Sequence, residues 1–262
     1  MKETKAPRVN ALHRGLQILE LLAGPKKRWS TSAISRKLKI PKSSASYLLH
    51  TLELRGYVRR EEDSAYRLSM KMLDLANLGL RGIEVRDISL PVLRRLVEET
   101  EMTGHVAVFD GPEAVYIVRV PSPGFIQVDT WVGRRMALHS SGAGKALLAF
   151  LPPRKADALL EGTELRRLTP QTIVAPARLR QELKKIRETG YAIDDEENTP
   201  GVRCVAAPIY DRSGEVAASL SLTGPVQQLT DDRLVRLAEK VKDRAHEITK
   251  VLGGSASPVT RK

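Results

Sequence analysis

Side chains that can hydrogen-bond to nucleic acid gather on one face of a single predicted helix near the N-terminus. The segment 41–56 begins with Pro41 and closes with Gly56, which suit the start and the C-terminal end of a helix, respectively. Its apolar residues keep the i, i+3, i+4, i+7 spacing of one buried stripe: Ala45, Leu48, Leu49 and Leu52. The remaining positions near its start carry hydrogen-bonding groups and no acid: Lys42, Ser43, Ser44, Ser46, Tyr47 and His50.

This distribution has two explanations. A helix that enters the major groove of DNA with its N-terminus first needs donors for phosphates and base edges in front and apolar anchors behind. An ordinary amphipathic helix also has a polar face, which is simply solvated. The pattern alone favours neither explanation, so the neighbouring elements decide between them.

Two helices are predicted ahead of this segment. The first begins at Asn10, which can serve as its N-cap, and has Leu12, Leu16 and Leu19 on its buried face. The second covers about 30–38, and the dipeptide Lys39-Ile40 connects it to the helix that starts at Pro41. Two short helices with a tight connection are typical of the helix-turn-helix arrangement. Between them, the basic residues 26–29 predict either a solvated turn or a phosphate contact.

A β-hairpin is predicted directly after the polar helix, which makes the unit a winged one. Its strands cover 57–60 and 65–68, and the acidic sequence 61–64 forms the turn. Arg59, Arg60 and Arg67 are placed to contact the DNA backbone, whereas the acidic turn should not press against phosphates. The next segment, 69–80, predicts a connecting helix, and Gly79 and Gly82 predict a hinge at its far end.

The net charge of +12 is concentrated in this first third. Residues 1–81 hold 17 basic and 7 acidic residues, whereas the remainder holds 26 basic and 24 acidic ones. Concentrated positive charge is the electrostatic footprint of a polyanion, and duplex DNA fits better than a membrane surface because fold-forming apolar residues interrupt the charges. We find no apolar run of membrane-spanning length and no secretory signal, and the single cysteine, Cys204, fits a reducing cytoplasm.

The last two thirds have a balanced charge and an α+β pattern. A helix to about 101, in which Pro91 should cause a kink or a late start, precedes strands at 105–109, 114–120 and 125–131. A further strand is expected at 136–139, followed by a helix that residues 140–145 open and that runs to about 151, and by helices over 154–160 and 177–189. Strands at 191–194, 202–210 and 215–222 and a helix over 231–252 complete a mostly antiparallel sheet with helices.

The glycine-rich sequence 140–145 resembles a phosphate loop only superficially. It lacks the first glycine of the P-loop and has Ala146 where Ser or Thr is required, and it lacks the third glycine of a dinucleotide-binding loop. Two explanations remain. The backbone amides at a helix N-terminus favour an anion such as a carboxylate, or the glycines only permit close packing.

No catalytic constellation stands out. Cys204 has no matching nucleophile motif, the five histidines lack metal-ligand spacing, and the acidic run 194–197 is explained most simply as a solvated loop. No metal or cofactor is therefore expected. Two alternatives stay open: an enzyme that uses Cys204 or Asp194, and a redox sensor that uses Cys204.

The longer motifs resemble IclR-type bacterial transcriptional regulators over about residues 9–250. Residues 12–22, 39–44 and 52–58 resemble the winged DNA-binding domain of that family, and 133–149, 190–197 and 201–209 resemble its effector-binding domain. The resemblance implies a GAF-like C-terminal domain that binds a small molecule, often an organic acid. It also implies dimers or dimers of dimers, with the connecting helix joining the first pair.

The same resemblance implies an effector site. The polar contacts would come from Gly142, Ala143, Asp194, Cys204, Ser221 and Thr223, and the apolar wall from Phe125, Val128, Met136 and Val202. An apolar wall with a few directed donors suits a compact acid that has a hydrocarbon part.

We therefore expect a cytoplasmic, ligand-responsive DNA-binding regulator, either repressor or activator, that reads a near-palindromic operator as a homodimer or a dimer of dimers. Its domains should be a disordered arm (1–9), a winged helix-turn-helix domain (10–68), a linker helix (69–84), an effector-binding domain (85–252) and a disordered tail (253–262).

Overall fold

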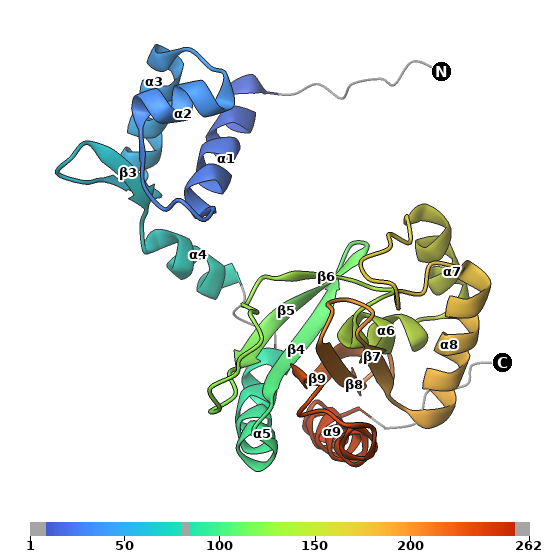
Figure 1. Cartoon of the computed structure of the whole chain (residues 1–262). Helices are drawn as coiled ribbons and strands as arrows, with labels where there is room; N and C mark the ends of the chain where they lie inside the picture. The colour runs from blue at the N-terminus through green and yellow to red at the C-terminus, as the bar shows by residue number, and fades with distance from the viewer. Residues whose placement is uncertain (1–8, 80–83, 255–262) are drawn as a thin grey trace, which may run out of the picture. The chain divides into compact units, whose positions relative to one another are not determined.

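The computed structural model describes residues 9–79 and 84–254, which fall into two compact units (Figure 1). The first unit ends at Gly82 and the second begins at Ile83. Most of the expected arm and tail, and the expected hinge at Gly82, lie outside the described residues. No helix among the described residues is both long and apolar enough to cross a membrane.

The first unit is a three-helix core with a small sheet and a further helix. Its elements are α1 (Asn10–Ala23), β1 (Trp29–Ser30), α2 (Thr31–Leu38), α3 (Lys42–Leu54), β2 (Val58–Arg60), β3 (Ala65–Leu68) and α4 (Lys71–Gly79). The three strands are antiparallel in the order β1-β3-β2. The helix-turn-helix and the hairpin are confirmed. Strand β1 was not predicted, and it forms because Trp29 and Ser30 pair with Tyr66 and Ala65.

The connection between α2 and α3 is fixed by local hydrogen bonds. Lys39 adopts a left-handed conformation with φ of 53°, which ends α2 after Leu38. The Ser35 hydroxyl donates to the carbonyl of Ile40 at 2.7 Å, and the Ile40 amide donates to the carbonyl of Ser35. Pro41 is the N-cap of α3, and Gly56 follows the helix with φ of 75°. The polar front of α3 is therefore held in a defined direction.

The buried face of α1 differs from the prediction. Ile18 and Leu22 are fully buried against the core, whereas Leu12 and Leu16 are 63% and 50% exposed. The periodicity allowed two apolar faces, and the core selects the one that carries Ile18. Asn10 is also not the N-cap, because Val9 takes that position without a side-chain hydrogen bond.

The second unit is a six-stranded antiparallel sheet with helices on both faces (Figure 1). The strand order is β6-β5-β4-β9-β8-β7. The strands are β4 (Thr103–Asp110), β5 (Glu113–Val120), β6 (Arg135–Ala137), β7 (Ala192–Asp195), β8 (Val202–Tyr210) and β9 (Val216–Pro225). The helices are α5 (Glu84–Thr100), α6 (Gly142–Ala149), α7 (Pro153–Gly162), α8 (Pro176–Thr189) and α9 (Asp231–Val251).

Two apolar cores hold these layers together. Helices α5 and α9 pack on one face of the sheet, and α6, α7 and α8 pack on the other. The predicted α+β class with a mostly antiparallel sheet is therefore confirmed. The sharp turn between β8 and β9 is also as predicted, since the Asp211 carboxylate accepts hydrogen bonds from the amides of Ser213 and Glu215.

Two predictions for this unit were wrong. The segment 125–131 is a loop and not a strand, because β6 at 135–137 takes the edge position beside β5 and leaves the loop free of the sheet. The late start expected from Pro91 does not occur, because α5 is continuous from Glu84 to Thr100, and the alternative of a kink at Pro91 stays a prediction.

Candidate functional site

The polar residues on the front of α3 point away from the core of the first unit. Lys42, Ser43, Ser46, Tyr47 and His50 are exposed, and the Tyr47 side chain is 76% exposed, while Ser44 is half-buried. Ala45 and Leu49 on the other face are fully buried. A large exposed aromatic ring among hydroxyls and a lysine offers both stacking area and hydrogen-bond donors for a nucleic acid.

The arginines of the wing are not free. The Arg59 Nε donates to Glu61 Oε1 at 2.8 Å, and Arg67 pairs with the same carboxylate. Arg60 donates to the Ser64 hydroxyl. These three arginines were predicted to contact the DNA backbone, and Glu61 competes with phosphates for two of them.

A second acid of the hairpin, Asp63, pairs with Arg28 at 2.7 Å. This ion pair links the basic loop before α2 to the wing, so Arg28 is also paired with a carboxylate. The ion pairs are exposed and therefore weak, which leaves these arginines available to a stronger anionic partner.

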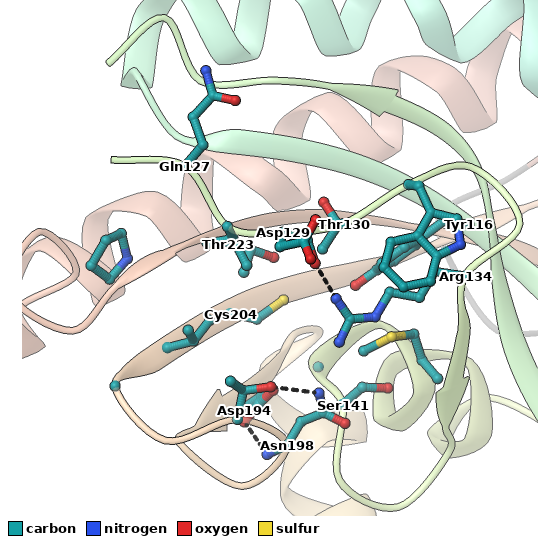
Figure 2. A pocket seen from close by; sticks show the side chains of 18 of the residues that line it. Tyr116, Gln127, Asp129, Thr130, Arg134, Ser141, Asp194, Asn198, Cys204 and Thr223 are labelled. Carbon is teal, nitrogen blue, oxygen red and sulfur yellow. Dashed lines mark hydrogen bonds between the residues drawn. The ribbon is translucent and has the colours of Figure 1, made fainter. Parts of the chain in front are cut away.

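A cavity of about 480 Å³ opens in the second unit, between the loop before β6, the start of α6 and the ends of β7, β8 and β9 (Figure 2). Of the ten residues that the family resemblance implied for the effector site, seven line it: Val128, Met136, Gly142, Asp194, Val202, Cys204 and Thr223. Ala143 and Ser221 are fully buried and do not line it. Phe125 does not line it either, because its side chain is fully exposed on the loop after Gly124.

The glycine-rich turn at the start of α6 has the packing role that was one of the two explanations left open by the sequence; the anion-binding explanation stays a prediction. A Cβ on Gly144 would lie 2.7 Å from the carbonyl oxygen of Ala137 and from the Cα of Leu138, so this glycine permits close packing. Ser141 is the N-cap, and its hydroxyl accepts from the Gly144 amide at 3.1 Å. Gly142 and Ser141 face the cavity, where the helix N-terminus favours partial negative charge.

Asp194 is a buried carboxylate at the wall of this cavity. Its Oδ1 accepts hydrogen bonds from the amides of Glu197 at 2.8 Å and Asn198 at 3.2 Å, and Figure 2 shows Asp194 beside Asn198. Burial raises the pKa of Asp194 to about 7, while the charge of Lys145 acts in the opposite direction. The side chain is therefore able to donate or accept a hydrogen bond near neutral pH.

Cys204 lies beside Asp194, its partner across β7 and β8. The thiol is 4% exposed, and burial together with the Asp194 carboxylate raises the pKa of Cys204 to about 12. The thiol stays protonated at neutral pH, so it is neither an activated nucleophile nor a reactive redox centre. It acts as a small apolar wall residue beside the hydroxyls of Ser221 and Thr223.

A histidine without catalytic character lies buried behind the cavity wall, in contact with Tyr116 and Thr130, which line the cavity. His105 stacks on Tyr116 with ring centroids 4.2 Å apart, and its Nε2 lies 2.8 Å from the Thr130 hydroxyl. Burial lowers the pKa of His105 to about 3, so the ring is neutral. The structural role expected for His105 agrees with this environment.

Several cavity residues were missed by the sequence reasoning. They are Tyr116, Gln127, Thr130, Trp131, Arg134, Ser141, Asn198 and Thr199, together with Ile126, Asp129, Gly201 and Pro225. Half of them belong to the loop 126–134, whose first part, up to Trp131, was predicted to be a strand. The pair Arg134-Arg135 directly before a strand was the available signal, because a basic residue is unusual beside an apolar wall.

Comparisons with known proteins agree with both units. Residues 78–250 match the family described as the bacterial transcriptional regulator IclR C-terminal domain, and residues 11–62 match the IclR helix-turn-helix domain. The chain is 33% identical to the HTH-type transcriptional regulator XynR of Escherichia coli over 248 residues, which cover 94% of this chain and 98% of XynR.

Solved structures extend this similarity to the fold. The IclR protein of Thermotoga maritima superimposes with a TM-score of 0.84 at 33% identity, covering 94% of this chain and all of that one. An IclR homolog from Microbacterium hydrocarbonoxydans, crystallised as a complex with 4-hydroxybenzoate, gives a TM-score of 0.81 at 26% identity and covers 92% and 98% of the two chains.

Proposed function

This chain belongs to the IclR family of bacterial transcriptional regulators and is a ligand-responsive DNA-binding protein, and we propose that α3 reads its operator while the cavity beside α6 binds a small carboxylate. The observation that carries the proposal is the pair of separate sites: an exposed polar helix on a basic unit, and an internal cavity in a unit of balanced charge. The family is not enzymatic, which removes the enzyme alternative.

The DNA contacts are proposed from exposure and chemistry. Lys42 and the hydroxyls of Ser43 and Ser46 lie at the start of α3, where a helix contacts phosphates and base edges. Tyr47 and His50 follow on the same exposed side. Ser44 and the wing residues Arg59, Arg60 and Arg67 are proposed as supporting backbone contacts, with the two ion-paired arginines released from Glu61 on binding.

A homodimer or a dimer of dimers is proposed because two helices of the first unit leave apolar residues in solvent. Val9, Leu12 and Leu16 are exposed on or beside α1, and Leu73 and Leu75 are half-exposed or more on α4. Exposed apolar residues that lie together on a surface mark sites of protein–protein contact. A twofold dimer would read a near-palindromic operator with half-sites roughly one helical turn, about 34 Å, apart.

The effector is proposed to be a small organic acid that acts in the cytoplasm. The cavity combines an apolar wall with the α6 N-terminus and the side chains of Asp194, Cys204 and Thr223. The 4-hydroxybenzoate bound by the Microbacterium relative is a compact acid of this type and is a suitable first probe. Binding would shift the population between DNA-competent and DNA-incompetent arrangements of the two units.

The experiment is a selection of duplexes from a random pool by the full-length chain, followed by a gel-shift titration. Lys42→Ala and Ser46→Ala should weaken binding to the selected duplex about tenfold or more, whereas Lys184→Ala on exposed α8 should not change it. Selection of no sequence, or equal affinity for all variants, would contradict the role of α3.

A further inference from the structure

Arg134 is the single basic side chain among the described residues that line the effector cavity. Two acidic side chains also line it. Asp129 is exposed to solvent, whereas Asp194 is buried in the wall formed by β7. The charge inside the cavity is therefore unevenly placed, with a cation on the loop before β6 and a buried carboxylate on another element.

The backbone of a tight turn holds Arg134 in place. The Arg134 amide donates to the Trp131 carbonyl at 3.1 Å, and Gly133 has a φ of 91° that favours glycine. The turn is attached to β5, because the Gly133 amide donates to the carbonyl of Tyr116 at 2.7 Å and the Tyr116 amide donates to the Arg134 carbonyl. The position of the side chain is thus fixed by the sheet and not by a flexible loop.

The guanidinium group is oriented but keeps free donors. Its Nη1 donates to the backbone carbonyl of Asp129, and its Cζ lies 5.2 Å from the centre of the Trp131 ring. Figure 2 shows the group pointing into the cavity, toward the side where Cys204 lies. A guanidinium has five N–H donors, so most of them remain for a ligand.

The charge of Arg134 has no carboxylate partner among the described residues. Its neighbour Arg135 shows the contrast, because Arg135 pairs with both Asp110 and Glu113 outside the cavity. Of these two adjacent arginines, Arg135 is therefore neutralised by acids of the fold, whereas the charge of Arg134 faces the cavity. A carboxylate ligand is the natural partner for such a fork of donors.

The wall at Asp194 suits a different group. Asp194 is 4% exposed, and both of its known hydrogen bonds use Oδ1, which leaves Oδ2 for the cavity. Thr223 lines the same wall, and its buried hydroxyl has no hydrogen-bond partner among the described residues. A ligand carboxylate beside Asp194 would meet a like charge whenever Asp194 is ionised, whereas a hydroxyl can hydrogen-bond to both Asp194 and Thr223 in either protonation state of Asp194.

We propose that Arg134 binds the carboxylate of the effector, and that a hydroxyl elsewhere on the effector binds at Asp194 and Thr223. The effector is then a hydroxy acid whose apolar body lies against Val128, Met136 and Val202. This inference rests on the proposed function of the cavity and adds the orientation of the ligand. The inference places the carboxylate of the effector at the loop before β6 and not at the N-terminus of α6.

The test uses the full-length chain and a defined panel of compounds. The panel contains 4-hydroxybenzoate, mandelate and 4-hydroxybutyrate, each with its primary amide and with the analogue that lacks the hydroxyl. Dissociation constants are measured by calorimetry for the wild type and for Arg134→Gln, Arg134→Lys, Asp194→Asn and the matched control Arg135→Gln. Circular dichroism checks that every variant is folded.

At least one hydroxy acid should bind, and its amide should bind at least tenfold more weakly. Arg134→Gln should weaken the binding of that acid about 10- to 100-fold, since a hydrogen bond to a charged group is lost. The dissociation constant for Arg134→Lys should lie between those of the wild type and Arg134→Gln. Arg135→Gln should bind like the wild type. Asp194→Asn should reduce the preference for the hydroxy acid over its hydroxyl-free analogue.

Three outcomes would overturn the inference: no hydroxy acid binds, an acid binds equally well to Arg134→Gln, or Asp194→Asn tightens acid binding. The last result would place the carboxylate at the α6 N-terminus. A hydroxy acid that depends on Arg134 but leaves the affinity for the selected duplex unchanged would support this inference and contradict the proposed effector function. The two failures are therefore distinguishable.

Discussion

The ammonium group of Lys145 donates a hydrogen bond to Glu197 inside the second unit, where Lys145 is fully buried and Glu197 is 7% exposed. Glu182 on α8 lies 3.7 Å from the same ammonium group. The carbonyl of Glu197 accepts from Thr172 at 2.6 Å, and its amide donates to Asp194. One buried ion pair thus connects α6, the loop before α8 and the carboxylate of the effector cavity.

Replacement of Lys145 should destabilise the second unit strongly. In Lys145→Met the buried Glu197 carboxylate loses its partner, and we expect the free energy of unfolding to fall by about 3–5 kcal/mol. Urea denaturation measures this. Lys184→Met on the exposed side of α8 should cost less than about 0.5 kcal/mol.

A double variant separates the charge from the packing. Lys145→Met combined with Glu197→Gln removes the buried unpaired carboxylate and leaves only the partly exposed Glu182 without its partner, so it should recover part of the lost stability. A double variant that is less stable than Lys145→Met alone would contradict the electrostatic explanation.

The stability of the chain should depend on pH through Asp194. Its pKa is about 7 in the folded state and near 3.8 when unfolded, so the folded state holds an extra proton between these values. The stabilisation is complete below about pH 4 and is lost as the pH rises to 7, by on the order of 4 kcal/mol at most.

Asp194→Asn should remove this dependence, because an amide does not titrate in this range. The fold should be kept, because the amide oxygen can still accept hydrogen bonds from the amides of Glu197 and Asn198. The measurement is the free energy of unfolding from pH 4 to 8 for both proteins. The exposed cavity residue Asp129 gives the control, since Asp129→Asn should follow the wild-type profile. Parallel profiles for wild type and Asp194→Asn would contradict the assignment.

The glycine at position 144 should not tolerate a methyl group. A Cβ there would meet backbone atoms of Ala137 and Leu138 at 2.7 Å, so Gly144→Ala should cost about 1–3 kcal/mol and weaken effector binding. Gly162 at the end of α7 has no atom within 4 Å of such a Cβ. Gly162→Ala should be neutral or stabilise by up to about 1 kcal/mol, as measured by thermal unfolding.

The acid of the wing should restrain DNA binding. Glu61→Gln releases Arg59 and Arg67 for phosphates, so non-specific duplex affinity should rise several-fold and fall more steeply with salt. Glu62→Gln removes the same charge from an exposed neighbour. An equal gain from both variants would show that only net charge matters and not the ion pairs of Glu61.

The first unit was largely predictable because its signals are local. Pro41, Gly56 and the apolar stripe of α3 define that helix from its own residues, and the hairpin follows from its acidic turn. The buried face of α1 was not predictable, since Leu16 and Ile18 are both apolar. Only contacts with α3 and β3 select Ile18 for the core.

The cavity shows the opposite case. Asp194, Cys204 and Thr223 were assigned to one effector site only through the family resemblance, because their proximity depends on strand register across β7, β8 and β9. Lys145 was considered only as a phosphate-loop lysine, and its partner Glu197 is 52 residues away in the sequence. Arg134 was missed because the sequence does not show that residues 133 and 134 hydrogen-bond to Tyr116 of β5, which places this arginine at the cavity.

The most direct test of the account is the affinity of the full-length chain for its selected duplex, measured against the concentration of the hydroxy acid that binds best. The account predicts at least a tenfold change in the dissociation constant of the DNA as the acid saturates the cavity, and Arg134→Gln should need a 10- to 100-fold higher acid concentration for the same change. An acid that saturates the cavity by calorimetry and leaves the DNA affinity constant would contradict the account.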